Sequence, residues 1–136
     1  ADGYLDIVEL KKPSADVLRY DRSRRVWCWS AGASETVAQC ANYLRTVEEN
    51  RHRLELDEGL RFVKPRARIV MGRSNQWERR QHDALRTLNA ALHGIEIWTY
   101  DHVLSMGARL VACYEREPSD YQADDALDDD DPFGDQ

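Results

Sequence analysis

The chain has 136 residues, enough for one domain and too few for two of ordinary size. Hydrophobic residues form 42% of the chain and charged residues 32%, as in a soluble globular protein. No apolar run approaches the ~20 residues that span a bilayer. A membrane-spanning protein is therefore excluded, and no membrane partner is expected. The net charge of -6 does not exclude an anionic partner, because residues 115–136 hold ten acidic residues and one basic residue, which leaves 18 basic against 15 acidic residues in 1–114.

The first half of the chain predicts two strands followed by a long helix. Tyr4–Leu10 is rich in β-branched and aromatic residues and predicts a strand, and residues 26–29 predict a second strand before a turn at Gly32. Ser34 is expected to cap a helix that runs to about residue 53 and breaks before Gly59. One face of this helix carries the stripe that a buried helix needs, namely Val37, Cys40, Ala41, Leu44 and Val47.

The second half predicts strand, helix, strand and helix. Residues 68–71 predict the next strand, and Asn75 is expected to cap a helix that stops at Gly94. Residues 95–100 alternate with a period of two, which is the clearest strand signal in the chain. Asp101 is then expected to cap a last helix, whose apolar stripe is Val103, Leu104, Leu110 and Val111. This order predicts an α/β domain of three layers around a central mixed sheet.

Domain limits follow from composition. We expect one domain over residues 1–118, and the start at Ala1, almost directly in a strand, suggests that an upstream N-terminal part has been removed. Residues 119–136 are acidic and poor in large apolar groups, which predicts a disordered tail. The tail could be a solubilising appendage, or a DNA mimic that competes for the arginine-rich body.

The three cysteines show no metal-ligand spacing and are interpreted as reduced thiols of a cytoplasmic protein.

Glu9 and Lys11 are the candidate catalytic pair. Because side chains alternate along a strand, both point to one face while Leu10 points to the other. A carboxylate there can hold Mg²⁺ or Mn²⁺, and the lysine can place a metal-bound water and stabilise the charge that develops on phosphorus. A strand-edge pair that merely faces solvent is the alternative. The other residues of the strand are apolar, which favours a central strand, where charges are costly unless used or paired.

Gln39 is the third candidate catalytic residue. It lies off the apolar stripe of the predicted helix, with Tyr43 one turn further along. A glutamine at this position can form a hydrogen bond with a metal-bound water or a backbone phosphate, although a solvated helical glutamine is the ordinary interpretation.

An arginine-rich segment follows the candidate pair. Arginine supplies 15 of the 18 basic residues in 1–114, and its guanidinium matches phosphate oxygens bidentately. The candidate nucleic-acid-binding residues are interleaved with Tyr20, Trp27 and Trp29, and they are Arg19, Arg22, Arg24 and Arg25. The alternative is a solvated loop with one tryptophan packed into the core.

Three segments carry a family resemblance. Residues 7–13 (IVELKKP), 38–44 (AQCANYL) and above all 85–101 (LRTLNAALHGIEIWTYD) resemble the nuclease domain of Shedu anti-phage defence proteins, over roughly residues 4–114. The resemblance implies a restriction-endonuclease-like PD-(D/E)xK fold and a divalent-metal-dependent endonuclease that hydrolyses phosphodiester bonds of invading phage DNA. It also implies a homo-oligomer.

One departure from the family pattern concerns the metal site. The pattern needs an acidic residue on the strand before Glu9, but Asp6 falls on the opposite face and Asp2 lies in a predicted turn. We therefore expect the missing Asp upstream of Ala1, so this chain should bind metal poorly and be weakly active or inactive. Two alternatives follow: a catalytically silent nuclease-like module that binds DNA or a partner in an oligomer, and a repair or restriction nuclease of the same fold.

Overall fold

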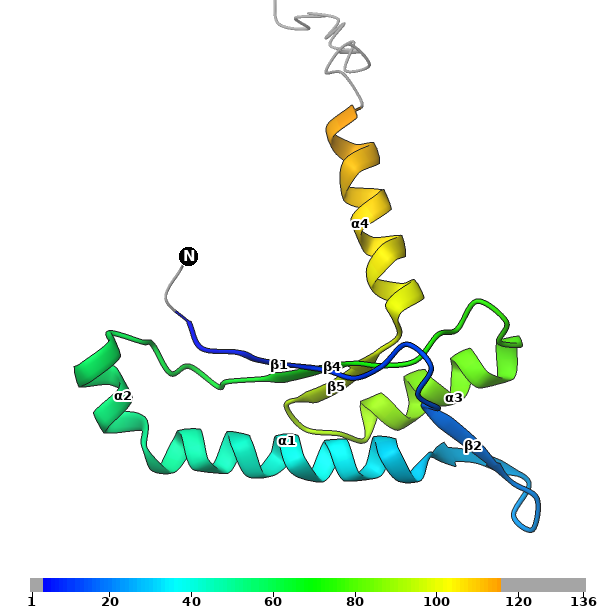
Figure 1. The fold of residues 1–136 in the computed structure, drawn as a ribbon, viewed down its shortest axis with the longest axis horizontal. Coiled ribbons are helices and arrows are strands. Elements are labelled where there is room, and N and C mark those ends of the chain that lie inside the picture. The colour runs from blue at the N-terminus through cyan, green and yellow to red at the C-terminus, as the bar shows by residue number, and fades with distance from the viewer. Residues whose placement is uncertain (1–3, 116–136) are drawn as a thin grey trace, which may run out of the picture.

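A computed structural model describes residues 4–115 (Figure 1). The described part is an α/β fold with four helices and with both parallel and antiparallel strand pairs. In chain order its elements are β1 (Ile7–Leu10), β2 (Leu18–Asp21), β3 (Val26–Trp29), α1 (Ala31–Glu49), α2 (Arg51–Glu58), β4 (Ala67–Val70), α3 (Arg79–Ala90), β5 (Ile95–Trp98) and α4 (Tyr100–Glu115). The predicted tail, residues 119–136, and the predicted domain limit at 118 lie outside the described residues.

The strands form a three-stranded parallel sheet in the order β1-β4-β5 and a separate antiparallel hairpin of β2 and β3. In the parallel sheet Glu9 is level with Ile69 and Ile97, so these three side chains share one face. Within the described residues β1 is an edge strand that pairs with β4 alone, not the central strand that its apolar sequence favoured. The strand also begins later than expected, because Tyr4 forms only an isolated bridge with Arg61.

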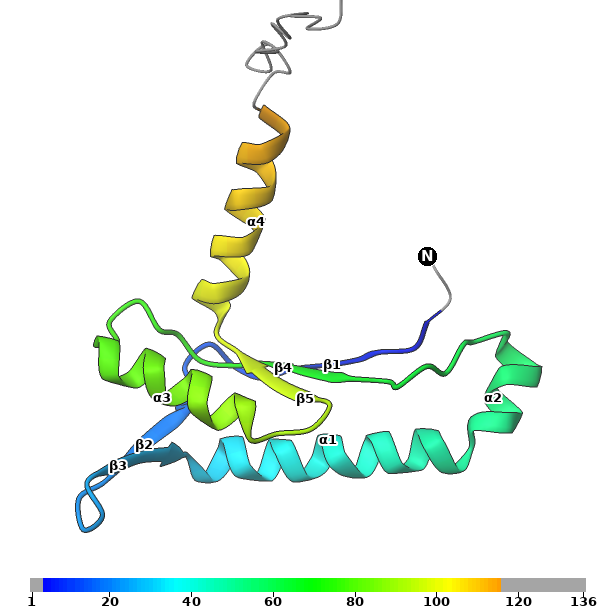
Figure 2. The ribbon, with the colours of Figure 1, turned by 180° about the vertical axis from the view of Figure 1, so that it is seen from behind.

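Helices cover one face of this sheet. In both views α1 and α3 lie below the three strands, and α4 leaves on the other side (Figures 1 and 2). The covered face holds the buried core, with Cys40 of α1 against Ile69 and Ile97. On the other face Val8 and Leu10 are 60% and 65% exposed. The third layer that we expected is therefore not found within residues 4–115.

The apolar stripe of α4 is the largest departure from the sequence-based expectation. The four residues of the expected stripe are all exposed, and they are Val103, Leu104, Leu110 and Val111. Met106 and Tyr114 of the same helix are exposed as well. The helix projects from the body instead of lying on the sheet (Figure 1). A helical period shows that a helix is amphipathic, and it does not show which surface covers the apolar side.

The start predicted for the first helix was also wrong. α1 begins four residues early, capped by Ser30, whose hydroxyl accepts a hydrogen bond from the backbone N–H of Ala33 at 3.0 Å. Ser34 lies within the helix. The predicted single helix divides at Asn50 into α1 and α2, and Gly59, at φ 63°, ends α2 as expected.

The starts of α3 and α4 are set by residues other than those expected. α3 begins at Arg79, with a capping box formed by Glu78 and Gln81 across its first turn, and Asn75 is not its cap. α4 begins at Tyr100, and the hydroxyl of Thr99 accepts from the backbone N–H of His102 at 3.2 Å. No helix in the described ranges is both long enough and apolar enough to cross a membrane.

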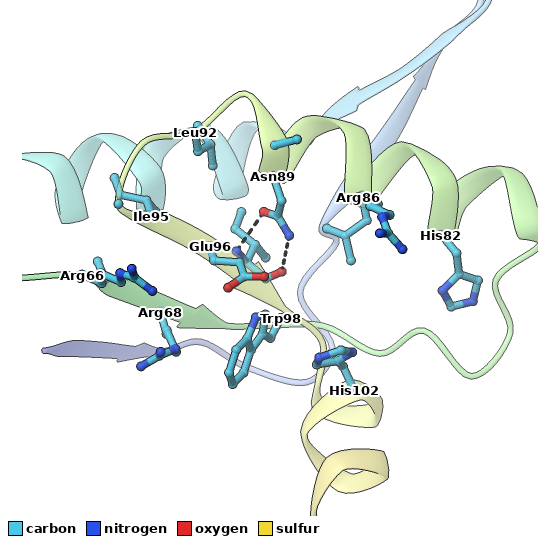
Figure 3. A pocket seen from close by; sticks show the side chains of 15 residues that line it. Arg66, Arg68, His82, Arg86, Asn89, Leu92, Ile95, Glu96, Trp98 and His102 are labelled. Atoms are coloured by element: carbon cyan, nitrogen blue, oxygen red, sulfur yellow. Dashed lines mark hydrogen bonds between the residues drawn. The ribbon is translucent and has the colours of Figure 1, made fainter. Parts of the chain in front are cut away.

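Asn89 closes the outer edge of the sheet. Its side-chain amide donates to the carbonyl of Ile97 at 2.8 Å and accepts from the backbone N–H of Ile97 at 3.0 Å (Figure 3). These two bonds replace a neighbouring strand, so the polar backbone of β5 is satisfied at this point without one.

Candidate active site

Glu9, Lys11 and Gln39 lie together in the structure. The side chains of Glu9 and Lys11 form an ion pair, with the ammonium nitrogen 2.8 Å from a carboxylate oxygen. The same ammonium donates to the amide oxygen of Gln39 at 3.3 Å, and the amide nitrogen of Gln39 donates to the hydroxyl of Tyr43. Glu9 on β1, Lys11 just after β1, and Gln39 and Tyr43 on α1 therefore form one continuous series of polar contacts.

The charge state of this cluster is set by Glu9. Its carboxylate, by accepting the hydrogen bond from Lys11, raises the pKa of Lys11 above the ordinary value, against a smaller opposing effect of burial. Lys11 is therefore a firmly protonated ammonium at neutral pH. It can stabilise a developing negative charge and donate hydrogen bonds, but it cannot accept a proton as a general base.

Cys40 lies next to the cluster and takes no part in its chemistry. Burial first, and the negative charge of Glu9 second, raise the pKa of the Cys40 thiol. A neutral thiol is a poor nucleophile and a poor metal ligand. The side chain is fully buried in the core, and the structure has Cys28, Cys40 and Cys113 as free thiols. Cys40 is therefore a packing residue.

The backbone around Lys11 is tied to the end of β4 and to the start of α4. The N–H of Lys11 donates to the carbonyl of Val70 at 2.9 Å, and its carbonyl accepts from the hydroxyl of Tyr100 at 2.7 Å. Gly72 links the same region, because its N–H donates to the carbonyl of Lys12 at 3.3 Å and its carbonyl accepts from the N–H of Tyr100 at 3.0 Å. The residues after β1, the end of β4 and the start of α4 therefore hold the backbone of Lys11 in place.

Metal-binding capacity rests on Glu9. Asp6 is occupied elsewhere, since it accepts from the backbone N–H of Arg66 at 3.0 Å and from the guanidinium of Arg68 at 3.3 Å. Asp2 lies outside the described residues. No group of three His, Cys, Asp or Glu side chains that could hold an ion is found in residues 4–115. Mg²⁺ in proteins is usually bound by one or two carboxylates together with waters and substrate phosphates. Glu9 supplies one carboxylate, the smallest number in that range, and the amide oxygen of Gln39 lies nearby.

The candidate nucleic-acid-binding arginines lie on the β2–β3 hairpin, part of which we had expected to be a loop. Arg19 is on β2 opposite Cys28, and the other three are in and beside the turn. Hydrogen bonds from Ser23 and then Arg24 fix this turn and lower the pKa of Asp21 to about 2. The hairpin projects from the body (Figure 1).

The structure bears on the alternative interpretation of this segment, whereas the DNA-contact interpretation stays a prediction. Trp29 is half-buried and packs against the core, as the alternative expected. Tyr20 and Trp27 pack against each other with tilted rings, whose centroids are 5.2 Å apart. Arg19 and Arg22 are exposed, and Arg24 is held by Asp21 in an ion pair of 3.1 Å. The arginines thus present positive charge to solvent, but no described contact joins them to Glu9 or Lys11.

Comparison with known families gives one match. The family model for the C-terminal region of the Shedu protein SduA matches residues 1–104, more than three-quarters of the chain. No curated protein matches it. The matched range contains all of the candidate cluster, the hairpin and the first residues of α4.

Proposed function

The chain belongs to the family of the C-terminal region of the Shedu protein SduA, which points to a role in anti-phage defence, and we propose that it is a metal-dependent endodeoxyribonuclease acting on invading phage DNA in the cytoplasm. The observation that carries the proposal is the contact of Glu9 and Lys11 with each other and with Gln39. An acidic side chain on an edge strand and a basic side chain two residues later, just after the strand ends, suit phosphodiester hydrolysis.

Each side chain has a separate role in this proposal. Glu9 is the metal ligand, and a bound Mg²⁺ or Mn²⁺ would polarise the scissile phosphate and lower the pKa of a water molecule. Lys11 places its positive charge beside the phosphate, where negative charge develops in the transition state. Gln39 orients Lys11, and Tyr43 in turn holds the amide of Gln39. Lys11 and Gln39 are held before substrate arrives, so little reorganisation is needed.

The exposed arginines of the hairpin indicate the class of substrate. Arg19, Arg22 and Arg25 expose guanidinium groups on the hairpin, and Arg24 adds a fourth that is already paired. Such a surface fits the phosphate backbone of DNA and carries no base-specific information. We therefore propose DNA as the partner, bound in a strongly salt-dependent manner.

A plasmid-nicking assay with and without Mg²⁺ or Mn²⁺ tests the activity. Glu9→Gln and Lys11→Ala should each lower the rate by ~10²-fold or more, because each removes a charge that acts on the transition state. Gln39→Ala should give a smaller loss with an unchanged melting temperature. The matched controls are Glu35→Gln on α1 and Lys12→Ala, both exposed residues outside the contacts of the cluster. Near-native rates for both Glu9→Gln and Lys11→Ala would refute the site.

A catalytically silent DNA- or partner-binding module is the second candidate, and the single carboxylate of the cluster favours it. Fluorescence anisotropy with a short DNA duplex, measured beside the nicking assay, separates the two. A nuclease both binds and nicks the DNA when Mg²⁺ is added. A silent module binds it with a steep salt dependence and leaves the plasmid intact at every metal concentration.

We also propose that the chain forms a homo-oligomer through α4. Val103, Met106 and Leu110 recur at the spacing of a two-helix seam, and all three are exposed. Leu110→Asp should shift the molar mass measured by light scattering toward the monomer. Ala108→Asp, on the opposite side of the helix, is the control and should leave the mass unchanged. An equal mass for wild type and Leu110→Asp would exclude this seam.

A further inference from the structure

A cationic cavity lies where α3, β5 and the start of α4 meet (Figure 3). It has a volume of about 700 Å³. The basic side chains that line it come from three elements and from the residue before β4, and they are Arg66, Arg68, His82, Arg86 and His102. It lies along β5, at the opposite edge of the sheet from β1 and the Glu9–Lys11 cluster. We call it the α3–β5 cavity.

The positive charge of the cavity is only partly balanced by the described residues. Arg68 pairs with Asp6 at 3.3 Å and lies over the ring of Trp98 at 5.3 Å. Arg66 and Arg86 are exposed, and neither has an ion-pair partner within residues 4–115. Among the described residues, Glu96 is the only acidic one in the lining. Three guanidinium groups against one carboxylate make this a site for an anionic ligand.

We propose that the α3–β5 cavity binds the acidic C-terminal segment of the same chain, residues 117–136. This segment has nine acidic residues and no basic residue, and it contains four consecutive aspartates at 128–131. Its charge is opposite to that of the cavity. The chain reaches the segment through α4, whose residue His102 lines the cavity. The inference does not depend on nuclease activity.

The lengths allow the segment to return to the cavity. Glu115 ends α4 thirteen residues after His102, so the helix carries the chain about 20 Å away at 1.5 Å per residue. Asp128 follows thirteen residues after Glu115. An extended stretch of that length spans roughly 43–47 Å, about twice the distance to be covered. The stretch is therefore long enough to bring the four aspartates back to His102, which lines the cavity, with length to spare.

Tryptophan side-chain signals in a ¹H–¹⁵N NMR spectrum of the whole 136-residue chain test this. Trp98 lines the cavity, and its indole nitrogen is buried with no hydrogen-bond partner among the described residues. Replacing all four aspartates by asparagine (Asp128→Asn through Asp131→Asn) should move the Trp98 indole signal. The other three indole signals, from Trp27, Trp29 and Trp77, should stay in place. Raising the salt from about 0.1 M to 1 M, which shortens the Debye length from about 10 Å to about 3 Å, should move the wild-type signal in the same direction.

A charge-matched pair of double variants locates the contact. In Arg66→Gln with Arg86→Gln, neutralising the aspartates should no longer move the Trp98 signal. In Arg79→Gln with Arg80→Gln, which removes the same charge from exposed positions outside the cavity lining, the shift should persist. Loss of the shift in both variants, or in neither, would overturn the proposal.

Three further outcomes would also overturn it. The first is an unchanged Trp98 signal when the four aspartates are neutralised. The second is a shift that disappears on dilution, since the bound segment would then belong to a second copy. The third is a short DNA duplex that moves the Trp98 signal equally in the wild type and the neutralised variant, which would make the cavity a nucleic-acid site.

Discussion

Gly72→Ala should destabilise the protein strongly, because two separate costs coincide at this residue. Gly72 follows β4 with a φ of +67°, a conformation that costs a residue with a side chain about 1–2 kcal/mol. An added Cβ would also lie 2.5 Å from the carbonyl oxygen of Ala15 and 2.6 Å from a methyl group of Val17. The first neighbour is backbone and the second is a core residue only 2% exposed, so neither can move aside cheaply.

The steric cost can be isolated with a matched glycine. Gly59 has almost the same φ, +63°, but an added Cβ there meets nothing within 4 Å. Gly59→Ala should therefore lose only the conformational cost. Overpacking of a core typically adds about 1–3 kcal/mol, so Gly72→Ala should lower the free energy of unfolding by about 2–5 kcal/mol in total. Urea unfolding followed by circular dichroism at 25 °C measures both variants.

The comparison also bears on the candidate site. Gly72 forms backbone hydrogen bonds with Lys12 and Tyr100, so displacement of residues 12–17 should disturb the contact between Lys11 and Gln39. If Gly72→Ala costs no more than Gly59→Ala, the close packing of the 12–17 segment over Gly72 is wrong, and with it the account of how Lys11 is held.

Two further predictions concern the polar contacts that position α4 and β5. The hydrogen bond from Arg73, and to a smaller extent the one from the N–H of Ser74, lower the pKa of Asp101 to about 2. The charged carboxylate of Asp101 therefore stabilises the fold fully above about pH 4, and this stabilisation is lost as the pH falls toward 2. Asp101→Asn should therefore be less stable than the wild type at pH 6, and a difference in urea midpoint that stays constant down to pH 2 would contradict this. Asn89→Ala leaves the N–H and carbonyl of Ile97 without partners and should cost about 1–3 kcal/mol, with faster amide exchange at Ile97 as the direct measure; unchanged exchange would refute the edge-closing role.

The sequence predicted best those features that depend on a short repeat. Alternation over residues 95–100 identified β5, and strand parity correctly placed Glu9 and Lys11 on one face and Asp6 away from them. The position of Gln39 could be predicted from helix periodicity in the same way, because a helical residue outside the buried stripe must face another surface. These inferences need only the geometry of one element.

The features that the sequence did not reveal depend on contacts between distant segments. Ser30 rather than Ser34 caps α1 because its hydroxyl also reaches the carbonyl of Asp16, and no local pattern distinguishes the two serines. β2 was missed because Leu18–Asp21 contains two charged residues and one tyrosine, and only pairing with β3 makes it a strand. The α3–β5 cavity draws its lining from residues 66–102, so its charge could not be read from any one segment.

The parallel pairing of β1 with β4 also sets the order in which the candidate site can form. Ile7 pairs with Ala67, sixty residues later, and no hairpin can join parallel strands. The β2–β3 hairpin and α1 need only local contacts and can form early. The contact between Lys11 and Gln39, by contrast, gains its rigid frame only once the long loop has closed, at an entropic cost that slows folding. Glu9 and Lys11 should thus be among the last residues to reach their native positions, and refolding should restore function later than it restores helix content.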